Sequence, residues 1–252
     1  MKGKVCHIQP IAAVSLGEGP GQTGLCVVHR EERQLGKPYG FAKERFDRYG
    51  RQVKGRAAER DDLVTRVDLE TLYSVKHLER PEGSLSDVLR RLLVILANLE
   101  GDERPVGAID LRATGYPAFR EFWRMADDAD LGVVLMPAVV SNAMGNSGGK
   151  NSEGAFVIPR ANLITAGHLA FSTARLRVAP LLRLASTLRT ELNEFTRKPM
   201  PANIDDPWRL STNDDLVLAT TLAVYAGEMM PRRKHREIDP WEGTPLADGT
   251  GG

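Results

Sequence analysis

Residues 213–219 read Asn213-Asp214-Asp215-Leu216-Val217-Leu218-Ala219, and the apolar run continues to Ala226. Asn213 is a favourable N-cap, and the helix dipole stabilises carboxylates in a first helical turn. A helix that is apolar nearly all round is expected to be buried, here against a sheet. Two interpretations are open: a capped core helix, or a buried helix whose Asp214 and Asp215 hold a divalent metal such as magnesium or manganese.

The composition is that of an ordinary globular protein. The chain has 252 residues, of which 42% are hydrophobic and 27% charged, with a net charge of +1. The overall charge therefore does not indicate a nucleic-acid binder, although residues 160–198 carry seven Arg or Lys against two Glu. The only cysteines, Cys6 and Cys26, have no metal-type spacing and are expected to be reduced. No signal peptide or long apolar stretch is visible, so we expect a cytoplasmic protein without a membrane partner.

Apolar periodicity predicts an α/β fold with three strands before the first helix. A glycine-rich turn between the first two strands favours an antiparallel start, and the alternation of strands and helices that follows favours a mixed sheet. The expected strands are 11–14, 25–28, 69–77, 106–111 and 132–136, and the expected helices begin at Ser84, Pro117, Pro159, Leu181 and Asp214.

Two segments depart from this pattern. Residues 30–62 hold ten Arg or Lys and seven Asp or Glu with few aliphatic residues, which is typical of a solvated surface insertion. Such a segment is expected to be partly disordered or to form a charged arm that contacts a phosphate backbone or a partner protein. Residues 230–252 are rich in charge, proline and glycine and are expected to be a disordered tail. The sequence thus predicts one domain over residues 1–229.

Six stretches, taken in order, resemble motifs of the nuclease domain of phage terminase large subunits, which is similar to ribonuclease H. They are the glycine-rich hairpin at 11–28, Ala113-Thr114-Gly115-Tyr116-Pro117, Phe156-Val157-Ile158-Pro159-Arg160-Ala161-Asn162-Leu163, Arg175-Leu176-Arg177-Val178-Ala179-Pro180, Glu191-Leu192-Asn193-Glu194-Phe195 and residues 213–219. The resemblance covers about residues 11–226 and implies a ribonuclease H-like fold that hydrolyses DNA with two metal ions.

The resemblance also implies three carboxylate positions, and only one of them is intact here. The position on the first strand falls on Ser15 and the next on Arg112, while Asp214 and Asp215 occupy the third. A serine is a poor metal ligand and an arginine repels a cation, so we expect a degenerate centre without a cofactor. Arg112 would then pair with Asp214 or Asp215 in place of the metal.

The expected function is therefore a non-catalytic DNA-binding module or a prophage-derived remnant. The resemblance implies nucleic-acid contacts at Arg160, Arg175 and Arg177. No Walker-type motif is present, so DNA packaging would need a separate motor or portal-type protein as a partner.

Two alternatives stay open. Asp110 and Glu18 could supply displaced carboxylates that hold Mg²⁺ or Mn²⁺ together with Asp214 and Asp215, which would make the chain an active endonuclease. The charged segment 30–62 could instead serve a protein-interaction domain. The sequence does not indicate the oligomeric state.

Overall fold

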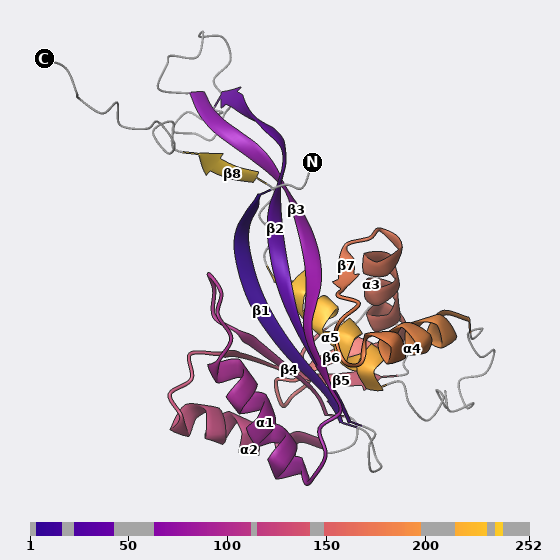
Figure 1. Ribbon diagram of the computed structural model, residues 1–252. Coiled ribbons are helices and arrows are strands. Elements are labelled where there is room, and N and C mark those ends of the chain that lie inside the picture. Colours follow the sequence, from indigo (N-terminus) through magenta and orange to yellow (C-terminus); the bar gives the residue numbers. More distant parts are fainter. Residues whose placement is uncertain are drawn as a thin grey trace, which may run out of the picture. The chain divides into compact units, whose positions relative to one another are not determined.

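The computed structural model describes residues 4–16, 23–42, 63–111, 115–141, 149–197, 215–230 and 235–238 (Figure 1). Within these residues the chain forms eight strands and five helices. In chain order they are β1 (Val5–Leu16), β2 (Thr23–Ala42), β3 (Leu63–Glu79), α1 (Leu85–Ala97), β4 (Val106–Asp110), α2 (Gly115–Asp128), β5 (Val134–Ser141), β6 (Phe156–Pro159), α3 (Arg160–Ser172), β7 (Leu176–Val178), α4 (Ala185–Arg197), α5 (Asp215–Met229) and β8 (His235–Ile238).

The strands form one mixed sheet in the order β6-β5-β4-β1-β2-β3-β7, with β8 paired to β3. Strands β1, β2 and β3 are antiparallel neighbours (Figure 1), and the connection 17–22 between β1 and β2 is too short for a parallel crossover. Strands β4, β5 and β6 then add in parallel next to β1. The α/β class predicted from the sequence is confirmed, with a central mixed sheet, an antiparallel start and flanking helices.

The chain divides into two compact units. The larger unit takes in His7–Glu31 and Thr71–Pro231 and so contains all five helices. The smaller unit contains the described residues Val5–Cys6 of β1, Glu32–Ala42 of β2, Leu63–Glu70 of β3, and β8. The candidate site described below lies entirely in the larger unit.

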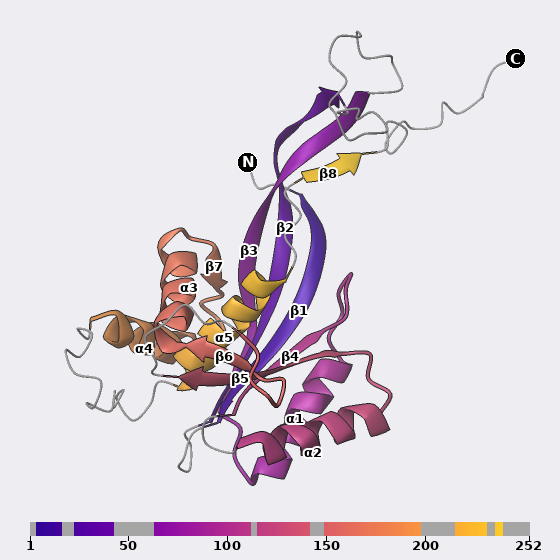
Figure 2. The ribbon, with the colours of Figure 1, turned by 180° about the vertical axis from the view of Figure 1, so that it is seen from behind.

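Two hydrophobic cores cover the two faces of the sheet in the larger unit. Ala12, Val14 and Leu16 of β1 point to the core formed with α1 and α2. Ile11 and Ala13 point to the opposite core, formed with α3, α4 and α5 (Figure 2). Because side chains alternate along a strand, Ser15 lies on the α5 face.

The helices form where local sequence favours them. Ser84, where the sequence places the start of this helix, caps α1 and forms a capping box with Asp87. Burial continues from Asp215 to Val224 in α5, which matches its nearly uniform apolar character. None of the helices in the described part of the chain is long and apolar enough to cross a membrane.

Several expected boundaries need correction. Strand β2 continues to Ala42, so residues 30–42 belong to the sheet and are not a surface loop. Arg30, Glu31 and Glu32 are buried. A strand with charged residues at its buried positions lacks the apolar alternation from which strands are predicted. Strand β8 lies inside the tail expected to be disordered. Residues 43–62, 231–234 and 239–252 lie outside the described residues.

Candidate functional site

The centre of the candidate site is a pair of residues on neighbouring parallel strands. Ser15 of β1 and Asp110 of β4 are partners in the strand register, and each side chain is only 1% exposed. Val106 and Ala108 of β4 belong to the α5-side core, so by alternation Asp110 faces α5 as Ser15 does. A carboxylate and a hydroxyl therefore lie on adjacent strands, on the same face of the sheet, at the carboxyl end of β1 and β4.

Asp215, the first residue of α5, lies at the same end of the sheet. A Cβ atom on Gly24 would be 2.3 Å from the carbonyl oxygen of Asp215, so the start of β2 is in direct contact with the first turn of α5. Thr23 and Gly24 follow β1 through the short connection 17–22, which places them beside the end of β1 that carries Ser15. Asp215 is 6% exposed. The helix predicted to begin with two carboxylates thus packs on the sheet at Ser15.

A buried carboxylate from α4 holds the first turn of α5. Glu191 is 5% exposed, and its Oε2 accepts a hydrogen bond from the backbone N–H of Val217 at 3.3 Å. Its Oε1 accepts a hydrogen bond from the guanidinium of Arg80, which follows β3. An anion at this point satisfies an N-terminal amide and is favoured by the helix dipole.

Glu191 has no assigned role in the sequence prediction, although it lies in one of the six stretches. Its position in the sequence is the one signal for burial, because Glu191 directly precedes Leu192, which forms an apolar stripe with Leu188 on α4. A charged residue at the edge of such a stripe is brought close to the core. Its partner amide lies on another helix, so pairing could not be read from spacing.

The three arginines expected to contact nucleic acid lie in different environments. Arg160 begins α3 directly after β6 and is buried. Arg175 donates to Glu228 at 2.8 Å, and Glu228 also accepts from Tyr73, so the charge of Arg175 is neutralised inside the fold. Arg177 of β7 is exposed. Of the three arginines, only Arg177 is exposed, and it forms no hydrogen bond or ion pair with the described residues.

Other predicted site residues lie outside the described residues. They are Glu18, Arg112 and Asp214, so the expected pairing of Arg112 with Asp214 or Asp215 stays a prediction. Within the described residues no group of three or more His, Cys, Asp or Glu is arranged to hold a metal ion. That finding does not include Glu18 or Asp214.

The described part of the site offers oxygen atoms as metal ligands, but they carry little negative charge. Asp110 and Asp215 supply two carboxylates, and the buried Oγ of Ser15 has no hydrogen-bond partner among the described residues. Oxygen ligands suit a hard cation such as Mg²⁺ or Mn²⁺. Two such ions bring four positive charges, however, and two carboxylates do not balance them. The described residues alone therefore do not fit a two-ion centre.

Comparison with known proteins adds a distant likeness. No protein-family model matches the chain, and no curated protein matches it. Among solved structures the chain is similar to a human cytomegalovirus terminase nuclease domain soaked with Mn. The identity is 12% and the TM-score 0.43, over 90% of this chain and 87% of that chain. At these values the likeness is a distant structural relationship and says nothing about activity.

Proposed function

We propose that this chain is a DNA-binding protein built on a ribonuclease H-like, nuclease-type fold whose metal centre is degenerate. The observation that carries the proposal is Ser15. It is buried at the end of the first strand and directly beside Asp110, where the resemblance implies a carboxylate. A neutral hydroxyl at this position removes one negative charge from the centre of the site.

The electrostatic balance of the site supports loss of metal binding. Ser15 contributes no negative charge beside Asp110, so this pair holds a divalent cation less strongly than two carboxylates would. Arg112, expected to pair with Asp214 or Asp215, would reinforce this effect.

Exposed arginines near β7 support a role in binding DNA. Arg177 of β7, Arg183 between β7 and α4, and Arg189 of α4 are all exposed. Guanidinium groups on one segment of the chain can contact successive phosphates and give affinity without base specificity. We therefore place the DNA contact on Arg177, Arg183 and Arg189, and not on Arg175, whose charge is paired with Glu228.

The proposal is tested by measuring fluorescence anisotropy of a labelled DNA duplex in EDTA. We expect binding that weakens steeply with salt, and each of Arg177→Gln, Arg183→Gln and Arg189→Gln should reduce the salt slope by about one. Arg124→Gln is the matched control, because Arg124 is exposed on α2 and pairs with Asp128. Absence of DNA binding, or equal loss in the control variant, would overturn the proposal.

An active endonuclease is the second candidate. It is favoured by one observation: Asp110 and Asp215 are both buried at the same end of the sheet, on the α5 face. With Asp214 or Glu18 as a further ligand, such carboxylates would hold Mg²⁺ or Mn²⁺, which activates water for phosphodiester hydrolysis. A plasmid-nicking assay separates the two candidates. Metal-dependent nicking that is lost in Asp110→Asn supports the enzyme.

The partners form part of the same proposal. DNA is the principal partner, and a separate motor or portal-type protein would be needed for any role in packaging, as the resemblance implies. We propose a cytoplasmic location, where linear or replicating phage DNA would be reached. Co-purification of the DNA-binding activity with cytoplasmic and not membrane fractions is the expected result.

A further inference from the structure

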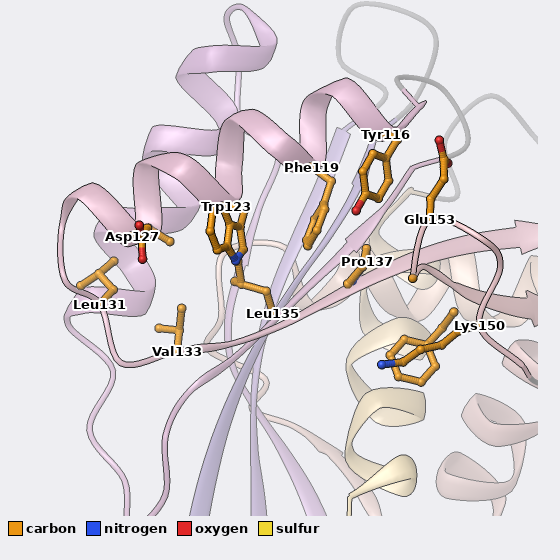
Figure 3. Close-up of a pocket in the computed structure, with 13 residues that line it drawn as sticks. Tyr116, Phe119, Trp123, Asp127, Leu131, Val133, Leu135, Pro137, Lys150 and Glu153 are labelled. Atoms are coloured by element: carbon orange, nitrogen blue, oxygen red, sulfur yellow. The ribbon is translucent and has the colours of Figure 1, made fainter.

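Two hollows in the larger unit differ in the charges that surround them. One is a groove of about 400 Å³ between α2 and β5 (Figure 3). Asp127, Glu153 and Lys150 line it, and the guanidinium of Arg120 lies over the Tyr116 ring. Positive and negative groups balance there, so the charge of this groove selects no ligand.

The other hollow is a narrow slot where α3 and α4 lie over α5. It is lined by Ile164, Gly167, His168 and Phe171 of α3, Leu192 and Asn193 of α4, and Thr221 of α5. A Cβ atom on Gly167 would be 2.3 Å from the methyl group of Thr221, so α3 and α5 approach closely at this point. The Thr221 hydroxyl donates to the carbonyl oxygen of Val217 at 2.8 Å. Thr221 therefore contributes its methyl group to the slot, because its hydroxyl is used within α5.

The size of the slot limits what can enter it. Its volume of about 30 Å³ is close to the volume that one water molecule takes up in the liquid, and a methyl group is of similar size. A buried water molecule needs several polar partners, whereas Ile164, Phe171 and Leu192 offer apolar surface. The slot is too small for the Trp and Tyr side chains that anchor protein interfaces. A single methyl group is therefore the occupant that fits best.

Phe171 offers a stacking surface beside the slot. It is 47% exposed, and its ring contacts neither another aromatic ring nor a cation among the described residues. Exposed aromatic rings of this kind bind single-stranded nucleic acids, because unpaired bases stack on them. Thymine carries a C5-methyl group, which proteins recognise by apolar contact. A thymine that stacks on Phe171 therefore brings a methyl group of the required size to the slot.

The exposed charges of this region are positive. In residues 160–193, which end at the last described side chain of α4, Glu191 is the only acidic residue. It is buried and accepts a hydrogen bond from Arg80. The exposed charged residues of this span are Arg177, Arg183 and Arg189. Arg189 precedes Asn193 by four residues, so both lie on one flank of α4, and a phosphate bound by Arg189 lies next to the slot.

We infer that the slot binds one unpaired thymine of single-stranded DNA. The base stacks on Phe171, its C5-methyl group enters the slot, and a neighbouring phosphate lies against Arg189. This inference rests on the proposed DNA binding and adds to it the form of DNA and one preferred base. The bases of a duplex are paired and stacked on one another, so a duplex contacts the arginines without using Phe171.

The test compares labelled oligo(dT), oligo(dU) and a mixed-sequence duplex by fluorescence anisotropy in EDTA, with strands of about 15 nucleotides. Phe171→Ala should weaken oligo(dT) binding at least about fivefold, because one stacked base is lost, and Phe171→Tyr should retain it. The wild type should bind oligo(dT) about fourfold more tightly than oligo(dU), which lacks only the methyl group. Duplex binding should be the same in the wild type and Phe171→Ala, which also shows that the variant is folded.

Trp123→Ala is the matched control, because Trp123 is an exposed aromatic residue of the groove along α2, and it should leave oligo(dT) binding unchanged. Equal oligo(dT) binding by the wild type and Phe171→Ala overturns the inference, and so does equal binding of oligo(dT) and oligo(dU). Both outcomes differ from failure of the proposed function, in which the duplex does not bind either. A wild-type dimer that Phe171→Ala dissociates in sedimentation velocity would also overturn the inference, because Phe171 would then lie in an interface between two copies of the chain.

Discussion

Ser15 and Asp110 are partners in the register of two parallel strands, and both side chains are buried on the face of the sheet that α5 covers. A hydroxyl therefore stands next to a carboxylate at the position where the resemblance to terminase nucleases implies a second carboxylate. Two like charges buried this close would need a cation to balance them. In the proposed degenerate centre, Ser15 places no second carboxylate beside Asp110, so this pair needs no cation to balance it.

Replacing Ser15 by Asp tests this interpretation. We expect Ser15→Asp to lower the free energy of unfolding by about 3 kcal/mol in EDTA, because the new carboxylate is buried beside Asp110. Mn²⁺ should restore part of the lost stability, and it should restore more in the double variant Ser15→Asp with Arg112→Asp. In Ser15→Asn the new side chain has the shape of Asp without its charge. This variant should therefore lose less stability, and Mn²⁺ should not restore that loss. Equal behaviour of the two variants in urea unfolding would contradict the interpretation.

The contact between β2 and α5 gives a second prediction. Gly24→Ala should destabilise the protein by at least about 2 kcal/mol, because its Cβ would lie 2.3 Å from the backbone oxygen of Asp215. Gly132→Ala is the control: its Cβ would meet no atom within 4 Å, so a change below about 0.5 kcal/mol is expected. Chemical denaturation measures both. Tolerance of alanine at Gly24 would show that α5 does not approach the sheet as described.

The buried carboxylate of Glu191 gives a third prediction. Glu191→Ala should cost about 3 kcal/mol, because it removes the buried carboxylate that accepts hydrogen bonds from Arg80 and from the amide of Val217. Hydrogen exchange at the first turn of α5 should accelerate in the same variant. Glu82→Ala, at an exposed glutamate, should change stability by less than about 0.5 kcal/mol. Unchanged exchange near Val217 would show that Glu191 does not hold this turn.

His29 gives a prediction about pH. Burial lowers the pKa of His29 below its ordinary value, and the positive charge of Lys76 lowers it further, against the opposite effect of Glu31. Neutral His29 therefore contributes stability that is complete above the unfolded-state pKa of about 6.5 and is lost as pH falls through the folded-state pKa. His29→Gln should flatten the decline in stability from pH 7 to pH 5. Urea unfolding at several pH values measures the decline, and an unchanged decline in His29→Gln would contradict the prediction.

The sequence was informative where periodicity alone determines structure. The apolar run after Asp215 predicted a buried helix, and another helix was expected to begin at Ser84. The order of strands and helices predicted the mixed sheet. The end of β2 was missed, because the charged residues 30–42 have no apolar alternation and their strand pairing depends on distant residues.

The site was predictable only in part. Asp110 was expected as a displaced carboxylate, but its pairing with Ser15 depends on strand register, which spacing from the Ala113-Thr114-Gly115 turn does not determine. Glu191 could not be assigned a partner, because Arg80 and Val217 are distant in sequence.

The most direct test of the degenerate centre is the thermal unfolding midpoint of the wild-type protein as Mg²⁺ or Mn²⁺ is titrated against an EDTA reference. A ligand that binds the native state raises the midpoint in a concentration-dependent way. The account predicts no saturable rise with either ion. A saturable rise that disappears in Asp110→Asn would contradict it and show that the carboxylates hold a metal despite Ser15.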